Sequence, residues 1–282
     1  MSVAASEQLD VAEAERCYRE ALRVAKRAGD ANSHAARLAS AQLGQLLYER
    51  GEVVEADRLL DESYHLGAEG GGVEFMIARY VTGAHIKAVR GDRDAAAARL
   101  DSAAHVAATI GLPRLRAHVD CERIRLDLPG GQTGPDAQND ALPDDGLGEI
   151  TAQLRDETEI RGLLADQPGI ACERAQAWAQ RLQHQGRPRA LLQANRLLVA
   201  ALSAAGRTDE AKQTLATIAA QCAERGMIRY LDGGPQVVAL LTELRDDLHS
   251  GRGRPTWPTI PPAFLESLAK EAHPAGSSAD RT

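Results

Sequence analysis

The chain has 282 residues, of which 44% are hydrophobic but only 3% are aromatic, and its formal net charge is −7. This length allows a sizeable core, built as one elongated array or as two domains, and alanine and leucine must fill it because aromatic side chains are scarce. The acidic balance gives no support for nucleic-acid binding by the chain as a whole, since binding to phosphates requires a basic face.

Apolar residues recur with helical spacing through the first half of the chain. We predict helices at 11–28, 31–50, 53–68, 72–90, 93–110 and 113–128. Glycines follow the ends of these helices, and acidic residues or a proline open the next ones, which is typical of helix C-termini and N-termini. No segment alternates apolar and polar residues as a strand would, so we predict an all-α fold.

A clear break in the helical pattern comes at 129–148, where the sequence PGGQTGPDAQNDALPDDGLG is rich in proline, glycine and aspartate. This segment has almost no apolar side chains and is long for a loop in a compact domain, so we expect a mobile acidic insertion. It separates N-terminal helical repeats at 1–128 from C-terminal helical repeats at 149–248.

Helical spacing resumes after the insertion, and we predict helices at 149–165, 169–185, 188–205, 208–225 and 235–248. The remainder, 249–282, is a proline-rich tail that we expect to be extended and mobile. Its one apolar group (Phe264, Leu265 and Leu268) predicts a single short helix, and its last residues are expected to be disordered.

A helical hairpin recurs along the chain with its turn intact. Segments beginning at Leu43, Gly83 and Leu198 align on a turn glycine, followed by a small residue five positions later and a leucine four positions after that. These positions are Gly51, Ala56 and Leu60; Gly91, Ala96 and Leu100; and Gly206, Ala211 and Leu215. The step of about 40 residues between the first two suits stacked helix-pair repeats. Because one hairpin cannot bury its apolar face alone, we expect a right-handed superhelix with an extended binding surface.

The chain begins in the middle of such a repeat. AERCYREAL from Ala14 matches ADRLLDESY from Ala56, with Tyr18 in the place of Leu60. The preceding helix of this hairpin would end near Leu9, which leaves too few residues for a complete partner. We therefore expect a fragment of a longer protein, and a degenerate N-terminal cap is the alternative.

The cellular compartment follows from the cysteines and the apolar segments. Cys17, Cys121, Cys172 and Cys222 are widely separated and form no CxxC pair, which fits a reducing cytoplasm. The start of the chain lacks a charged segment followed by an apolar run, and no stretch reaches membrane-spanning length. We expect a cytoplasmic protein.

The motifs of common catalytic chemistries are missing from the sequence. It has no Gly-Lys dipeptide and hence no P-loop, and it also lacks the kinase catalytic motifs, HExxH, paired zinc cysteines and GxSxG. His65, His85 and His105 are spaced twenty residues apart, which could suggest a metal-binding face, but no carboxylate or second histidine lies at i+3 or i+4 with suitable ligand geometry, so they are interpreted as polar positions on successive helices. GAEGGG at 67–72 is interpreted as an interhelical turn. We predict no catalytic, cofactor or metal site.

The candidate partner-binding residues are Arg114, Arg116, Arg123 and Trp178. Arg116 and Arg123 are seven residues apart and share a helix face, which could hold an anion or an acidic partner. The alternative is a solvated face with acidic neighbours. Trp178 either packs between helices or offers a stacking platform to a ligand. Trp257, in the tail, either docks against a partner or has no role.

The segment from Gly206 to Leu244 resembles the last repeat of the MalT-type tetratricopeptide domain. The likeness rests on a small-residue hairpin followed by Gly226, Arg229, Leu231-Asp232, Gly234-Pro235 and a leucine helix through Leu240-Leu241. LPRLRAH at 112–118 is similar to the same domain, and the resemblance covers roughly residues 9–248.

The resemblance implies a sensor and coupling arm of large signalling ATPases, which usually end in a LuxR-type DNA-binding helix-turn-helix. A similar arm follows the kinase and ATPase regions of an actinobacterial serine/threonine protein kinase. The tail after Leu248 has no helix-turn-helix pattern, which favours the kinase-associated arrangement. The family implies an inducer or a regulatory protein on the concave face, and the scarcity of aromatic residues disfavours a stacked sugar.

Three hypotheses for function follow. The first is a regulatory arm, covalently linked to ATPase, kinase or DNA-binding domains, that shifts their activity by binding a small effector or a regulatory protein. The second is a free-standing adaptor that binds a peptide or a helix of a partner in its groove. The third is an enzyme that uses histidines and carboxylates of that groove. None of them requires direct contact with nucleic acid or a membrane.

Overall fold

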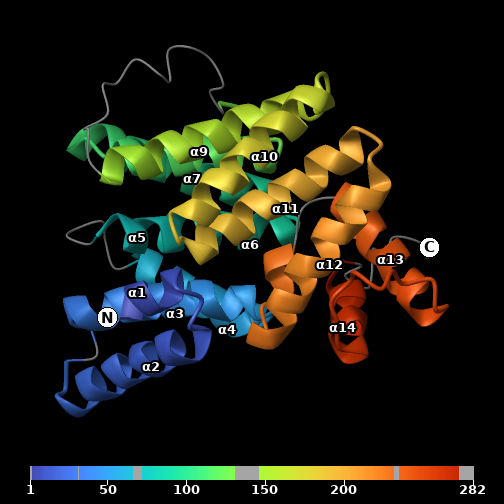
Figure 1. Ribbon diagram of the computed structural model, residues 1–282. Helices are drawn as coiled ribbons and strands as arrows, with labels where there is room; N and C mark the ends of the chain where they lie inside the picture. The colour runs from blue at the N-terminus through green and yellow to red at the C-terminus, as the bar shows by residue number, and fades with distance from the viewer. Residues whose placement is uncertain (1, 31, 66–71, 131–145, 232–234, 273–282) are drawn as a thin grey trace, which may run out of the picture. The chain divides into compact units, whose positions relative to one another are not determined.

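The computed structural model describes the chain except for residues 1, 31, 66–71, 131–145, 232–234 and 273–282 (Figure 1). The described residues are mostly helical and include no strand. Consecutive helices pack as neighbours joined by short turns, as in α6 with α7 and α11 with α12. The all-α, stacked-hairpin fold expected from the sequence is confirmed.

The chain forms two compact units, Met1–Tyr48 with Glu52–Leu163, and Glu49–Gly51 with Leu164–Thr282. The first contains α1 (Ser2–Glu7), α2 (Val11–Arg27), α3 (His34–Glu49) up to Tyr48, α4 (Val53–His65), α5 (Val73–Met76), the π-helix η1 (Ile77–Thr82), α6 (Gly83–Val89), α7 (Arg93–Ile110), α8 (Pro113–Arg125) and α9 (Gly146–Leu163). The second contains α10 (Pro168–His184), α11 (Pro188–Ala204), α12 (Thr208–Arg225), the 3₁₀-helix η3 (Ile228–Leu231), α13 (Pro235–His249) and α14 (Pro262–Ala272).

The compact units divide after Leu163, whereas the sequence suggested a break at 129–148. The reason is the packing of α9, which follows that segment in the chain but lies against α8. Most of the acidic insertion, 131–145, falls outside the described residues, so its expected mobility stays a prediction.

The repeat signature has a direct structural meaning. Its small residues (Ala14, Ala56, Ala96 and Ala211) all have an exposed fraction of 0%. The large residues four positions later are buried as well, namely Tyr18, Leu60, Leu100 and Leu215. In the α3–α4 hairpin a Cβ at Gly44 would lie 2.8 Å from Leu60 Cγ, so the two helices approach to the limit that glycine permits.

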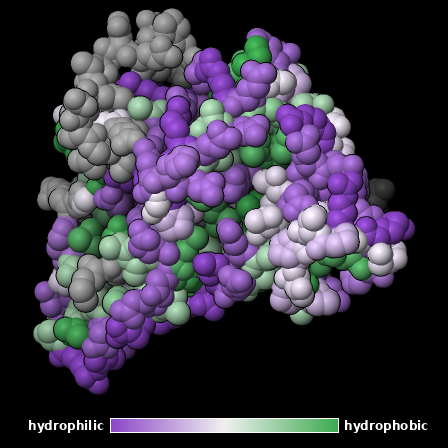
Figure 2. All heavy atoms as spheres, viewed as in Figure 1, coloured by the Kyte–Doolittle hydropathy of each residue, from purple (hydrophilic) through white to green (hydrophobic). Residues whose placement is uncertain are grey.

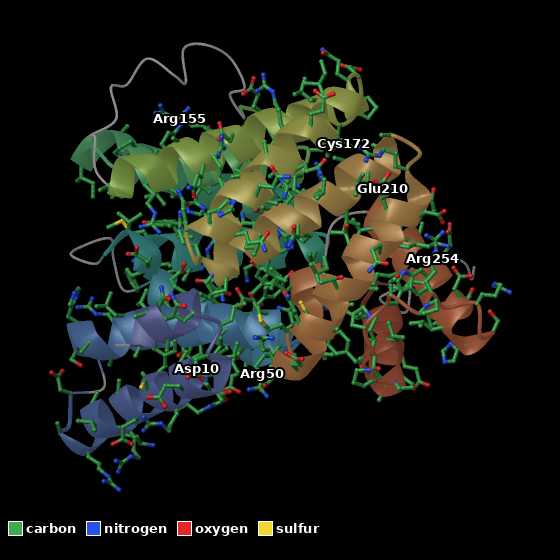
Figure 3. All side chains as sticks on the ribbon, in the orientation of Figure 1. Asp10, Arg50, Arg155, Cys172, Glu210 and Arg254 are labelled. Atoms are coloured by element: carbon green, nitrogen blue, oxygen red, sulfur yellow. The ribbon has the colours of Figure 1, made fainter. Side chains whose placement is uncertain are left out.

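Helix ends follow the expected chemistry. The turn glycines Gly51, Gly91 and Gly206 have φ angles of +87°, +86° and +72°, in the left-handed region that glycine adopts without steric cost. Asp10 caps the start of α2 by accepting a hydrogen bond from the backbone N–H of Glu13 at 3.2 Å (Figure 3). Beyond this cap, ion pairs such as Glu13–Arg16 line α2, whose surface is mostly hydrophilic in Figure 2.

The N-terminal register is as expected. The short helix α1 packs against α2 and ends at Glu7, just before Leu9, as the first helix of that hairpin should. Leu9 itself is buried and has a φ of +59°.

The helix expected at 72–90 departs from a regular α-helix. It consists of α5, the π-helix η1 and α6 in direct succession. A π-helix is rare because its wider turn loses packing and hydrogen-bond quality, so a specific interaction must stabilise it.

The proline-rich tail was expected to be extended and mobile; residues 252–261 form no helix or strand, and their expected mobility stays a prediction. Within the second unit, residues 250–261 make side-chain contacts with α12, and α14 packs against α13 and η3. The predicted short helix is confirmed as α14, and its apolar side chains are the reason that the tail folds back. Residues 273–282 lie outside the described part.

Candidate protein-interaction surface

Helix α8 positions the three arginines that the sequence singled out. It begins at Pro113, a residue favoured at the first helical position, directly after the turn at Gly111. Arg114, Arg116 and Arg123 all lie on this helix, and each contacts a different carboxylate.

Arg114 holds α8 to α5. Its guanidinium lies 2.5 Å from Glu74 Oε1, and its side chain is 18% exposed. Burial by itself raises the pKa of Glu74, but the hydrogen bond from its own backbone N–H and the charge of Arg114 lower that pKa below its usual value. The pair is therefore ionised at neutral pH and forms a salt bridge between α8 and α5.

Arg123 holds α8 to α7 and to the chain that follows α8. Its guanidinium pairs with Asp101 and donates a hydrogen bond of 2.6 Å to the carbonyl oxygen of Pro129. Its side chain is 13% exposed. Little of this cation is left for a partner.

Arg116 has the most exposed side chain of the three, at 41%. Its Nε donates to both oxygens of Asp120, one turn further along α8, at 3.0 and 3.2 Å. Asp120 is itself buried, so Arg116 is anchored at its Nε while the rest of its guanidinium faces solvent. Of the α8 arginines named from the sequence, Arg116 is the best placed to meet an acidic partner.

A buried polar pair, missed at the sequence level, joins α6 to α8. His85 Nδ1 lies 2.6 Å from Glu122 Oε1, and both side chains are less than 10% exposed. Tyr48 packs its ring against His85 edge to face, with centroids 5.5 Å apart. The two partners are 37 residues apart in the chain. No local pattern predicts such a contact, because it depends on how hairpins stack.

The carboxylate of Glu122 stays ionised despite its burial. Burial raises its pKa, but Arg125, at 3.6 Å, and His85 outweigh that effect and lower the pKa to about 2. His118, on the same helix, shows the opposite balance: burial and the charge of Arg114 lower its pKa to about 4. His118 is therefore neutral at physiological pH.

A second buried set of polar contacts, centred on Arg99, lies next to the π-helix. Arg99 of α7 donates hydrogen bonds to the carbonyl oxygens of Arg79 at 2.9 Å and Leu60 at 2.8 Å, and pairs with Asp61 at 2.6 Å. Its guanidinium also lies over the ring of Tyr64, 4.5 Å from the centroid. The bond to Arg79 O therefore places a buried guanidinium against a backbone carbonyl inside η1.

Trp178 lies on α10 and is 3% exposed. It shares the buried face of that helix with Cys172, Ala175 and Leu182. Trp178 is therefore packed inside the protein. A ligand could stack on its ring only if the buried face of α10 became exposed. Trp257 is half-buried in the tail and lies close to Gly253.

The described residues hold no group of three or more His, Cys, Asp or Glu side chains that could bind a metal ion. Of the three evenly spaced histidines, His85 pairs with Glu122 and His105 is exposed, whereas the side chain of His65 lies outside the described part. Across the same residues, helices that combine enough length with enough apolar character to cross a bilayer are absent.

Comparisons with known proteins identify a family and relatives that this chain resembles. Residues 4–247 match the family model of the MalT-like TPR region. The chain is 43% identical over 235 residues to the serine/threonine-protein kinase PknK of Mycobacterium tuberculosis and of Mycobacterium bovis. The match covers 81% of this chain and 21% of the kinase, so the chain spans about a fifth of the length of the curated relatives it matches. No solved structure matches the chain significantly.

These findings agree with the geometry: stacked helical hairpins with buried small residues at the helix crossings, and a match that runs through both compact units. The chain belongs to the MalT-like TPR region family.

Proposed function

We propose that this chain is the regulatory helical-repeat arm of a multidomain signalling protein, linked to a serine/threonine kinase. The observation that carries the proposal is the match to PknK, which is long and close but spans only 21% of that kinase. The arm itself is non-catalytic, since its fold is a helical repeat and its sequence has no kinase or phosphate-binding motif. A LuxR-type transcriptional output is less well supported, because the relatives found are kinases.

The arm acts by binding a regulatory protein or a small effector and thereby shifting the attached domains between a resting and an active state. Such a shift requires the ligand to bind the two states with different affinity. The reducing cytoplasm is the proposed compartment, consistent with four cysteines that form no disulfide.

Among the residues named from the sequence, Arg116 is the proposed partner contact. Its exposed guanidinium fits an acidic side chain or a phosphate, whereas Arg114 and Arg123 serve mainly to fix α8. Trp178 contributes to the packing of α10 in the core, and it would contact a ligand only if that ligand exposed the buried face of α10.

The first experiment is an immunoblot of fresh lysate with an antibody raised against this chain, whose mass is 30.1 kDa. A band several times larger supports an arm of a larger regulator. A band near 30 kDa overturns that proposal in favour of a free-standing adaptor.

The coupling is tested separately in the full-length protein by measuring kinase activity of Arg116→Glu. The matched control is Arg58→Glu, an exposed arginine of α4 that also pairs within its own helix. We expect partner-dependent stimulation to fall at least tenfold for Arg116→Glu and to remain in the control. Equal stimulation of both variants would remove Arg116 from the proposed surface.

A further inference from the structure

The chain beyond the family match contains a segment without regular secondary structure. The match ends at residue 247, and α13 ends at His249. The chain turns at Gly251 and runs to residue 261 before it forms α14. We call residues 250–261 the strap. Its hydroxyl-bearing residues are all exposed, namely Ser250, Thr256 and Thr259. Exposed hydroxyl groups in an irregular segment are more accessible to a modifying enzyme than hydroxyl groups packed along a helix.

Thr256 lies in a tight turn of the strap. The backbone N–H of Trp257 donates a hydrogen bond of 2.9 Å to the carbonyl oxygen of Arg254, which closes a turn of four residues. Pro255 takes the second position of this turn, where the fixed φ of proline is favourable, and Thr256 takes the third. The two central positions of such a turn project away from the body of the protein, and both residues are exposed.

The other two hydroxyl groups of the strap are less suitable acceptors. Ser250 donates its hydroxyl to the carbonyl oxygen of Asp246 at 2.7 Å, one turn back in α13. Thr259 stands directly before Ile260, which is 6% exposed. An enzyme that engaged Thr259 would have to pull Ile260 out of its packing. Thr256 carries no such constraint, since the two residues before it are exposed.

Two arginines precede Thr256 in the chain, Arg252 by four residues and Arg254 by two. Arg254 pairs with Asp209 at the start of α12 at 2.5 Å, and these side chains are 48% and 74% exposed (Figure 3). Arg252 pairs with Asp247 of α13 at 3.1 Å, and its side chain is 66% exposed. Solvent-exposed pairs of this kind contribute little to stability. Either guanidinium can therefore exchange its carboxylate for a more highly charged anion.

Helix α12 brings Arg254 and Thr256 to the same side. The hydroxyl of Thr256 donates a hydrogen bond of 2.7 Å to Gln213 Oε1, and Gln213 Nε2 donates one of 3.3 Å to the carbonyl oxygen of Thr256. Gln213 follows Asp209 by four residues, so the two side chains share one face of α12. Arg254, bound to Asp209, and Thr256, bound to Gln213, therefore lie along the same face, about one helical turn apart.

We propose that Thr256 is a phosphorylation site, at which a serine/threonine protein kinase transfers the γ-phosphoryl group of ATP to the threonine hydroxyl. Thr256 Oγ1 forms the new bond to phosphorus, and the bond between the γ-phosphorus and the bridging oxygen of ADP breaks. ADP leaves, and the hydroxyl proton passes to the catalytic aspartate of the kinase. The kinase is of the type that PknK represents, so the proposal rests on the proposed function for its choice of enzyme.

The phosphate exchanges the ion pairs of the strap. A phosphothreonine carries a charge of about −1.5 to −2 at pH 7 and has three acceptor oxygens. It has no hydroxyl proton to donate to Gln213, and it repels the carboxylate of Asp209. Arg254 therefore moves from Asp209 to the phosphate, where it forms a stronger, charge-assisted hydrogen bond. Asp209 remains favourable without this partner, because it lies in the first turn of α12, where the helix dipole favours negative charge.

The site is tested by incubating the full chain with PknK of Mycobacterium tuberculosis and Mg–ATP, and then mapping phosphate by mass spectrometry. Trypsin does not cut between Arg254 and Pro255, so Thr256 falls in the peptide 253–270, together with Thr259 and Ser267. We expect phosphate on Thr256 of this peptide. If the kinase phosphorylates a generic protein substrate in the same buffer and leaves Thr256 unmodified, the proposal is overturned. The linkage to a kinase is tested separately by the immunoblot, so the two failures are distinguishable.

Exposed substitutions in the strap identify the acceptor without disturbing the core. Thr256→Val removes the hydroxyl and keeps the shape of the side chain, and Thr259→Val is the matched control three residues further along. We expect phosphate in the peptide 253–270 to fall at least tenfold for Thr256→Val and to stay unchanged for Thr259→Val. Thr256→Ser, which keeps an acceptor hydroxyl, should retain the phosphate. Loss of phosphate in Thr259→Val alone would overturn the proposal.

The exchange of ion pairs is tested by phosphorus NMR of the phosphorylated chain during a pH titration. The second pKa of a phosphothreonine is ordinarily about 6, and a neighbouring guanidinium lowers it by favouring the dianion. We expect a lower phosphate pKa in the unaltered chain than in Arg254→Gln. Arg245→Gln, which removes an arginine that pairs within α13, is the matched control and should keep the lower value. The same pKa in all three proteins would overturn the proposed contact between Arg254 and the phosphate.

Discussion

The guanidinium of Arg99 lies against the backbone of Gly83, so closely that a Cβ at position 83 would come within 2.5 Å of Arg99 Nε. Arg99 cannot move aside easily, because it is buried and bonded to Arg79 O, Leu60 O and Asp61. Only glycine at position 83, the first residue of α6, leaves room for the Arg99 side chain to reach the π-helix.

Gly83→Ala should therefore destabilise the chain, although alanine is the better helix former. Relief of glycine's conformational entropy favours alanine by about 0.5–1 kcal/mol. Overpacking against a fixed side chain costs about 1–3 kcal/mol, and displacing Arg99 also weakens its buried hydrogen bonds. We expect a net loss of roughly 1–3 kcal/mol, measured by urea denaturation.

The matched control is Gly169→Ala in α10, where a new Cβ would meet no atom within 4 Å. There only the propensity effect operates, so stability should be unchanged or slightly higher. Equal effects of the two substitutions would contradict the close approach between Gly83 and Arg99.

A second prediction concerns the small positions of the repeat. Ala96 is fully buried at a helix crossing, whereas Ala98, two residues along the same helix, is exposed. Ala96→Leu should lower the free energy of unfolding by about 1–3 kcal/mol or more through overpacking, and Ala98→Leu should change it by less than about 0.5 kcal/mol. Thermal and urea denaturation of the pair check this. A neutral Ala96→Leu would mean that the hairpins stack more loosely than described.

The sequence was sufficient to predict the hairpins because their determinants are local. Turn glycines, small residues such as Ala96 and apolar positions such as Leu100 recur at fixed spacing, and each acts within one hairpin. The π-helix was not predictable in this way. Its Arg79 carbonyl accepts a hydrogen bond from Arg99 of α7; Arg99 lies on the same stripe of that helix as Ala96 and Ala103, but no local pattern shows which backbone group it bonds.

The same reasoning explains the outcome at the candidate site. The arginines of α8 were visible in the sequence, but their partners Glu74 and Asp101 were not, since they lie on other helices. Glu122 is one of the acidic residues near these arginines in the sequence, and its burial against His85 could not be seen there. Tertiary contacts thus decide which of the charged residues remain available to a partner.

A third prediction follows from His118. Burial and the charge of Arg114 lower its pKa to about 4, from an ordinary value of 6.5. Below pH 6.5 the unfolded chain takes up this proton before the folded chain does, so stability should fall between pH 6.5 and 4 and rise with pH across that window. The contribution is about 1–3 kcal/mol, measured as the difference in urea denaturation between pH 7 and 4.5.

His118→Gln should flatten this pH dependence, and His105→Gln, at an exposed position of α7, should leave it unchanged. If His118→Gln kept the full slope, other groups would account for the acid sensitivity. The loss expected from Glu122, whose pKa is about 2, comes at lower pH, as that carboxylate is protonated on falling from pH 4.5 through 2.

A fourth prediction concerns thiol reactivity, which depends on the thiolate and on access to it. Burial raises the pKa of Cys121 and of Cys222 to about 12, and Cys172 is 1% exposed. Cys17, on α2, is the more accessible thiol, although its hydrogen bond to Glu13 also raises its pKa. In native buffer at pH 8 we expect a thiol reagent to label Cys17 first and the other three only after unfolding in urea. Cys17→Ser should abolish the early phase, and rapid labelling of Cys121 or Cys222 in that variant would show that the repeats open locally around them.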